Sequence, residues 1–128
     1  MSKLIARTLS DGVNDVAVDT VFNGSAKAWA NLNGTGAIFL RDDFNIASVT
    51  DNGTGDYTKT FTSAFANSNF ACAGIVRFDA GSGVSGIFVT QRRGAVATPS
   101  SFQLNCESRP ASFFDCDKVM TVFNGDLA

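Results

Sequence analysis

Histidine is absent from the sequence, and its absence narrows the chemistry that the chain can support. Histidine is the commonest general base, the usual activator of serine and cysteine nucleophiles, and the commonest metal ligand. The three cysteines form no Cys-x-x-Cys pair and are too few for a zinc site. We therefore expect no enzyme activity, no metal site and no cofactor.

Long apolar runs and clusters of basic residues are lacking too. No stretch approaches the roughly twenty apolar residues that span a bilayer, and residues 1–8 lack the apolar run of a secretory signal. The net charge is −2, and Arg92-Arg93 is the only basic pair, whereas phosphate binding needs a clustered basic face. We expect a chain made in the cytosol that neither inserts into membranes nor binds nucleic acid.

Glutamate is scarce, since eleven of the twelve acidic residues are aspartate and only Glu107 is glutamate. Aspartate favours turns and glutamate favours helices. Twelve phenylalanines, with many valines, isoleucines and threonines, are typical of strands. A chain of 128 residues, 45% of them hydrophobic, is long enough for one domain with its own core. The composition predicts a single all-β domain.

Asn-Gly and Asp-Gly pairs, which favour tight turns, divide the chain into short segments. Asn-Gly-Thr-Gly occurs at Asn33 and again at Asn52, which indicates two similar turns rather than a repeat. Alternation of polar and apolar residues between the turns predicts an antiparallel β-sandwich or meander. The predicted strands cover residues 37–40, 45–50, 57–65, 70–78, 84–91, 101–106 and 118–123.

Two of these strands carry clear patterns. Residues 57–65 place Tyr57, Phe61 and Phe65 on one face and threonines on the other, as in a half-buried strand. Residues 70–78 are apolar on both faces, which predicts a central strand or one covered on both sides.

The first thirty residues are expected to form an N-terminal arm for attachment or oligomerisation, with the sandwich over residues 31–128. Residues 13–22 alternate like an extended ribbon, and residues 25–30 allow at most one helical turn. Because a lone ribbon buries too little surface to hold itself, we expect it to pack on another subunit or on a larger particle. The alternative is packing on its own sheet. The candidate interface residues are Val16, Val18, Val21, Phe22 and Trp29.

A second group of candidates lies in predicted loops, where arginine and aromatic residues are typical of binding hot spots. The simpler interpretation, which we favour, is solvated arginines and packed phenylalanines. The candidate receptor-contact residues are Arg92, Arg93, Arg109, Phe113 and Phe114.

The acidic residues offer a catalytic alternative, a glycan-hydrolysing enzyme that would use two of Asp42, Asp43, Asp56 and Glu107. Asp42 and Asp43 would also serve as calcium ligands with Asp51 or Asp56. Adjacent strand residues point to opposite faces, so we interpret this pair as surface residues.

Two further patterns have structural interpretations. The glycine-rich residues 79–86 lack the following helix of a phosphate-binding loop and are predicted to be a plain loop. Cys106 and Cys116 flank a predicted hairpin loop. We expect reduced thiols there, with a disulfide as the open alternative.

Residues 18–78 carry the phrase Lys-Ala-Trp, then Asn-Gly-Thr-Gly, then an arginine-bearing strand, and a second Asn-Gly-Thr-Gly followed by Asp56-Tyr57. In this wording the chain resembles a module of tailed-bacteriophage structural proteins. The likeness covers more than half of the chain and weakens after Gly83. The module usually ends a longer fibre protein, so here residues 1–30 would have to make the attachment.

The resemblance implies a virion component assembled in the host bacterial cytoplasm, commonly a homotrimer, that contacts other virion proteins. A tail-associated fibre or tip that contacts a host cell-surface glycan or protein is the first expectation, and a capsid-borne fibre or decoration protein is the alternative. From a different class, the domain would be a carbohydrate-binding module in which Trp29 or Phe113-Phe114 stacks on sugar.

Overall fold

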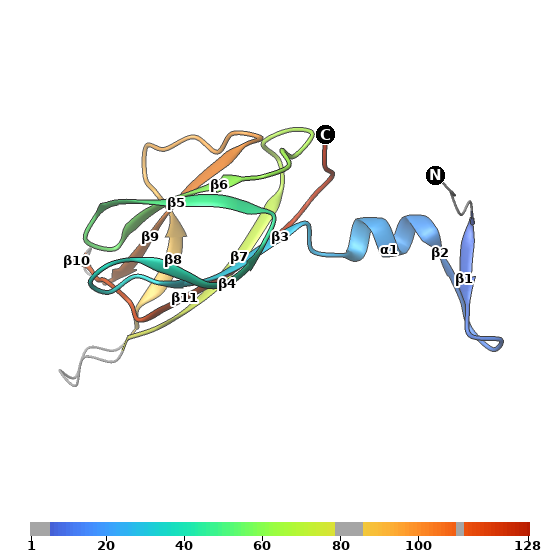
Figure 1. The fold of residues 1–128 in the computed structure, drawn as a ribbon, viewed down its shortest axis with the longest axis horizontal. Helices are drawn as coiled ribbons and strands as arrows, with labels where there is room; N and C mark the ends of the chain where they lie inside the picture. The colour runs from blue at the N-terminus through green and yellow to red at the C-terminus, as the bar shows by residue number, and fades with distance from the viewer. Residues whose placement is uncertain (1–5, 79–85, 110–111) are drawn as a thin grey trace.

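The computed structural model describes residues 6–78, 86–109 and 112–128 as an antiparallel β-sandwich preceded by an arm that extends away from it (Figure 1). The all-β sandwich predicted from composition and turn spacing is confirmed. The arm consists of a small hairpin and one short helix: β1 (Thr8–Ser10), β2 (Asp15–Ala17) and α1 (Val18–Gly24).

Two sheets pack face to face to form the sandwich. The four-stranded sheet has the order β4 (Phe39–Phe44), β3 (Ala28–Asn33), β11 (Lys118–Asn124) and β7 (Ala71–Arg77). The other sheet contains β5 (Ile46–Gly53), β6 (Asp56–Phe61) and β9 (Ser101–Ser108), and β9 also pairs with β8 (Phe88–Gln91) and β10 (Ser112–Phe113). Since β3 neighbours β11 and β6 neighbours β9, the chain crosses between sheets and is not a meander.

Each of the seven predicted strands coincides with an observed strand, with ends shifted by a few residues. The alternation in β6 is confirmed, because Tyr57 and Phe61 are buried while the threonines between them are not. The prediction that residues 70–78 form a central or doubly covered strand is wrong. β7 lies at the edge of its sheet, and Ile75 on its outer side is 64% exposed.

In the N-terminal region, the extended ribbon is contradicted from Val18 onward, and residues 25–30 form no helical turn. The ribbon expected over residues 13–22 becomes helical from Val18, because Val18, Val21 and Phe22 have the i, i+3, i+4 spacing of one helix face. The segment with a helical look, residues 25–30, enters strand β3 at Ala28, where pairing with β11 overrides the helix propensity of alanine. Trp29 therefore lies in the sandwich and not in the arm.

The core explains much of the phenylalanine in this sequence. Five rings pack together between the sheets with centroid separations of 4.5 to 6.0 Å, most of them edge to face. Burying each large side chain stabilises the fold by roughly 1.5 to 3 kcal/mol. The ring cluster comprises Phe61, Phe65, Phe70, Phe102 and Phe123.

Candidate attachment arm and recognition surfaces

The arm carries four of the five candidate interface residues; Val16, Val21 and Phe22 are exposed and Val18 is half-buried. Val18, Val21 and Phe22 form one stripe of α1, with Val21 41% and Phe22 63% exposed. In the hairpin, Val16 stands directly opposite Leu9, and both are exposed. Within the described part of the arm, residues 6–24, no side chain is buried.

The local structure of the arm is specified by short-range contacts. Asp11 Oδ1 accepts hydrogen bonds from the backbone N–H groups of Val13 at 2.9 Å and Asn14 at 2.7 Å, which closes the turn between β1 and β2. These bonds, that from Asn14 first, hold the pKa of Asp11 below its usual value. A seven-residue helix and a two-stranded hairpin are too small to be stable in water alone. The arm therefore needs burial that its own sandwich does not supply.

Lys27 connects the arm to the sandwich. Its backbone N–H donates to the carbonyl oxygen of Phe123 at 2.9 Å, which ties it to β11. Its ammonium group donates to the carbonyl oxygen of Phe22 and to the Ser25 hydroxyl at 2.8 Å. A cation at a helix C-terminus satisfies free carbonyls and interacts favourably with the helix dipole. Lys27 thus fixes the direction in which α1 leaves β3.

Trp29, the fifth candidate, lies on the outer side of the four-stranded sheet. Strand pairing sets it in one row with Phe44, Val122 and Ala73. The next row contains Met120 and Ile75 on one side and the polar residues Asn31 and Asp42 on the other. We call this surface the outer face, made of Trp29, Phe44, Ala73, Ile75, Met120 and Val122. All of these except Phe44 help to line a shallow groove of about 520 Å³. The structure thus divides the five candidates between the arm and an apolar sheet face.

Several segments are joined at the end of the sandwich opposite the arm, where β10 and the turn between β5 and β6 lie (Figure 1). The buried Tyr57 hydroxyl is within hydrogen-bond distance of the Gly34 carbonyl oxygen at 2.8 Å and Asp115 Oδ1 at 3.0 Å. The Gly55 N–H donates to the same carboxylate at 2.7 Å. Burial, followed by the nearby Asp115, raises the pKa of Tyr57. Both Asn-Gly-Thr-Gly turns are thereby joined at one end.

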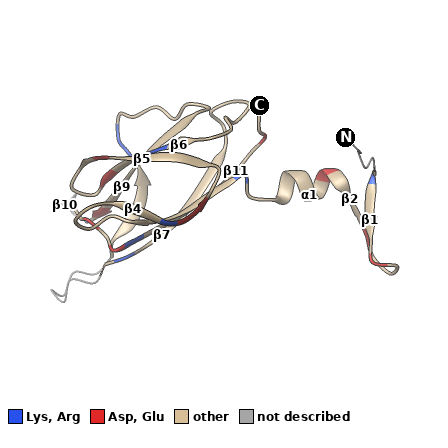
Figure 2. Ribbon diagram, in the orientation of Figure 1, with Lys and Arg blue, Asp and Glu red and all other residues tan. Residues whose placement is uncertain are grey.

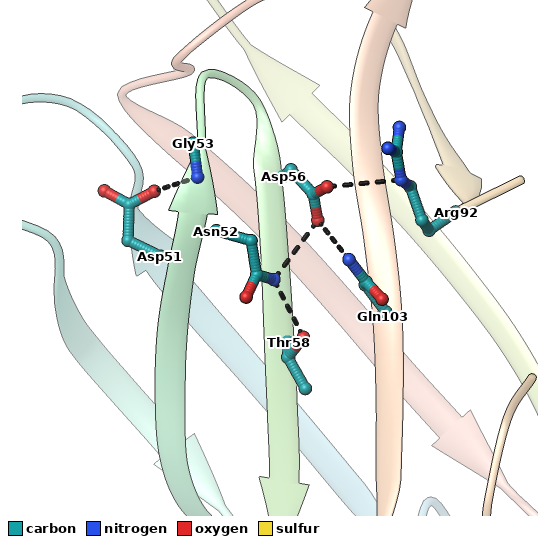
Figure 3. A network of polar contacts seen from close by, with 7 residues as sticks. All are labelled: Asp51, Asn52, Gly53, Asp56, Thr58, Arg92 and Gln103. Atoms are coloured by element: carbon teal, nitrogen blue, oxygen red, sulfur yellow. Dashed lines mark hydrogen bonds and ion pairs between the residues drawn. The ribbon is translucent and has the colours of Figure 1, made fainter. Parts of the chain in front are cut away.

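A polar network covers part of the outer side of the second sheet (Figure 3). Asp56 Oδ1 accepts from Gln103 at 2.7 Å and from Asn52 at 3.2 Å, and its Oδ2 pairs with Arg92 Nε at 3.2 Å. The Asn52 amide also donates to the Thr58 hydroxyl at 2.8 Å. With both oxygens engaged, the carboxylate holds Arg92 in a defined orientation.

Arg92 and Phe113 are the loop candidates that the structure brings together. The Arg92 guanidinium carbon lies 5.7 Å from the centre of the Phe113 ring, within cation–π range. Phe113 is 40% exposed, so this pair is open to solvent. Phe114 packs against Phe78 at a ring separation of 5.2 Å, as the packing interpretation expected. Arg93 and Arg109 are exposed.

The four candidate catalytic carboxylates are divided between the two sheets. Asp42 and Asp43 lie on β4, in register with Asn31 and Ala30, and point to opposite sides as expected. Asp56 belongs to the polar network, and Glu107 accepts a hydrogen bond from Thr90 at 2.9 Å. The structure therefore does not gather the four into one site.

The described ranges contain neither a cluster of metal-ligating side chains nor a helix that could cross a membrane. No group of three or more His, Cys, Asp or Glu side chains there is placed to hold a metal ion. Nor does any helix in those ranges have the length and apolar character to cross a bilayer. The glycine-rich segment, apart from Gly86, lies outside the described residues.

Sequence reasoning missed Lys59, which is fully buried between the sheets. Its ammonium group donates to the Thr121 hydroxyl, and burial lowers the pKa of Lys59 to about 8. Burial also raises the pKa of nearby Cys72 to about 11. The available signal was its position, since it alternates with Tyr57 and Phe61 on the apolar face of β6.

Cys106 and Cys116 are both buried and are free thiols in this structure. Their thiols lie in contact across the hairpin, and the shared hydrogen bond together with burial raises the pKa of Cys106. The pair therefore forms part of the packed core.

Comparisons of this chain with protein-family models, curated proteins and solved structures found no match. The roles of the arm and the two sheet surfaces are therefore inferred from their own chemistry.

Proposed function

We propose that this chain is a structural protein of a bacteriophage virion, a homotrimeric tail-associated fibre or tip component. The arm would attach it to sister subunits and other virion proteins, and the sandwich would face the host surface. The observation that carries this proposal is the arm itself: residues 6–24 present an apolar stripe and bury none of it. The resemblance to phage structural modules supports the same conclusion.

The arrangement of the sandwich supports a two-ended molecule. Figure 2 shows basic residues in the loop after β8, on the part of the sandwich away from the arm. Arg92 and Phe113 are there, combining a fixed guanidinium with an exposed ring. Such a pair suits contact with a host cell-surface glycan or protein, because aromatic rings stack on sugars and arginine binds carboxylates.

A capsid-borne fibre or decoration protein would use the same arm to grip the shell. Antibodies against the sandwich, applied to intact particles of the phage that encodes the chain, separate the two locations. Label confined to the tail supports the first proposal, and label spread over the shell supports the second. Absence of the chain from purified particles by mass spectrometry would refute both.

Assembly is tested by light scattering of the intact chain and of a variant that lacks residues 1–26. The deletion keeps Lys27 and its backbone bond to β11. We expect a trimer for the intact chain and a folded monomer for the variant. A well-folded monomer in both cases would contradict the assembly role of the arm.

A carbohydrate-binding module is the remaining alternative, and the open Arg92–Phe113 pair is the observation that favours it. Binding of the free sandwich to a glycan array, lost on Phe113→Ala and retained by Trp29→Ala, would locate sugar contact at this pair. The reverse pattern would locate it on the outer face. If the sandwich bound no glycan on the array, the carbohydrate-binding alternative would be refuted and the attachment role would stand without it.

A further inference from the structure

We propose that the outer face of the four-stranded sheet is the docking site for the arm of a second copy of this chain. The proposal rests on the assembly role of the arm given above, and it names the surface that receives the arm.

The receiving surface is open and mostly apolar. The row of Phe44, Trp29, Val122 and Ala73 is apolar across all four strands, and the next row is apolar on β11 and β7 but has Asn31 and Asp42 on β3 and β4. Phe44 at one edge is 53% exposed and Ile75 at the other edge is 64% exposed. Between them, Trp29, Met120 and Val122 line the shallow groove. The solvent-facing side of a sheet normally carries polar residues, so a complete apolar row that continues into Met120 and Ile75 indicates a covered surface.

The arm has a matching surface of similar size. Val18, Val21 and Phe22 form the stripe of α1, and Leu9 pairs with Val16 in the hairpin. A seven-residue helix is about 10 Å long, and four paired strands span about 14 Å between the outer two. The stripe can therefore lie across the rows of the outer face.

Charge favours the same docking. Residues 6–24 contain one arginine and three aspartates, a net charge of −2. At one end of the outer face, Lys118 and Arg77 stand side by side in register on β11 and β7. The acidic arm would thus meet a basic end of the sheet, although Arg77 also pairs with Asp117 at 3.7 Å.

The occupant is a second copy because one chain supplies both surfaces in equal number. The contacts of Lys27 direct α1 away from the sandwich, so the arm extends into space that a neighbouring copy would occupy (Figure 1). Because the donor and acceptor surfaces differ, the contact runs head to tail and closes either as a ring or as a reciprocal exchange.

Disulfide trapping between two differently tagged chains tests the contact directly. One chain carries Phe22→Cys, the other carries Ile75→Cys, and a mixture of unmodified chains under the same oxidant controls for the native cysteines. A disulfide-linked pair containing both tags is expected. Phe22→Cys chains linked only to each other would show that arms pair with arms, and absence of any link would also overturn the proposal.

A second measurement keeps the test independent of cysteine chemistry. In light scattering over a concentration series, Ile75→Asp should weaken association at least tenfold, and Phe44→Asp at the opposite edge should do the same. Val96→Asp is the matched control, since Val96 is 84% exposed in a loop of the other sheet. Equal association for the Ile75, Phe44 and Val96 variants would overturn the proposal.

Failure here differs from failure of the proposed function. If particles carry the label but no mixed disulfide forms, the chain is a virion protein whose arm binds elsewhere. If the mixed disulfide forms but particles lack the chain, the docking holds and the virion role fails.

Discussion

Replacing the buried Lys59 by methionine should stabilise the protein at pH 7. Burial lowers the pKa of Lys59 from its ordinary 10.5 to about 8, so keeping it charged inside the fold costs about 3 kcal/mol. Methionine has a similar length and no charge. The substitution also removes the hydrogen bond from Lys59 to the Thr121 hydroxyl, which costs about 1 kcal/mol. The expected net gain in the free energy of unfolding is about 2 kcal/mol.

The gain should depend on pH in a defined direction. Since the pKa of Lys59 is lower in the folded chain than in the unfolded one, the unfolded chain binds more protons between about pH 8 and pH 10.5. The free-energy cost of burying the charged Lys59 is therefore fully present below pH 8 and is lost as the pH rises to 10.5. Cys72, whose pKa is raised to about 11, is present in both proteins, so its contribution largely cancels in their difference.

Urea denaturation of parent and Lys59→Met at pH 7 and at pH 10, at one protein concentration, measures both effects. Arg93→Met in the exposed loop after β8 is the control and should change stability by less than about 0.5 kcal/mol. A less stable Lys59→Met at pH 7, or an equal difference at both pH values, would refute this account of Lys59.

Three further predictions concern the far end of the sandwich and the arm. Gly55 and Gly36 share a φ of +62°, but a Cβ on Gly55 would lie 2.7 Å from the Cys106 carbonyl oxygen whereas one on Gly36 would meet nothing within 4 Å. Gly36→Ala should lower the free energy of unfolding by roughly 1 kcal/mol, the cost of an alanine in the left-handed region. In thermal unfolding, Gly55→Ala should lower it by at least 2 kcal/mol more, because of the added clash. Tyr57→Phe should lower the free energy of unfolding in urea by about 1 to 2 kcal/mol, because it leaves Gly34 and Asp115 without the hydroxyl. Lys27→Met should speed hydrogen exchange of the backbone N–H groups in residues 18–24 and leave exchange in β11 unchanged. If residues 18–24 exchanged as slowly in the variant as in the parent, the capping role would be contradicted.

The strands were predictable where burial is decided by local alternation. Residues 57–61 show this best, because successive residues of a half-buried strand point to opposite faces and so alternate between buried and solvent-facing positions. The arm was harder, because apolar residues at 16, 18, 21 and 22 fit a strand period at their start and a helix period at their end. The alanines before Trp29 favour a helix locally, and only pairing with the distant β11 makes this segment a strand.

The residue types of the candidate surfaces could be predicted from the sequence, but which of these residues contact one another could not. Arg92 and Phe113 were candidates from their loops, yet their contact depends on β8 and β10 both pairing with β9. The ion pair between Asp56 and Arg92 likewise joins residues far apart in sequence. The apolar outer side of β7 was visible as a pattern, but sequence does not tell whether a sheet face meets its own core or another chain.

The far end of the sandwich is ordered by hydrogen bonds within one subunit, whereas the described part of the arm buries no side chain of its own. Substitutions at the far end should therefore affect the stability of a subunit, and substitutions in the arm should affect assembly. At the far end, Tyr57 and Asp115 join both Asn-Gly-Thr-Gly turns by hydrogen bonds within one subunit, so these loops are ordered before any ligand arrives. Preordered loops lose little entropy on binding, which suits contact with a surface ligand. The arm has no buried side chain among its described residues, so in the docking that we propose its order would be gained on binding. Substitutions at Tyr57 should thus change the unfolding of each subunit. Phe22→Asp should instead weaken the association of subunits, and in dilute solution, where the full chain is dissociated, it should leave the urea midpoint of unfolding unchanged.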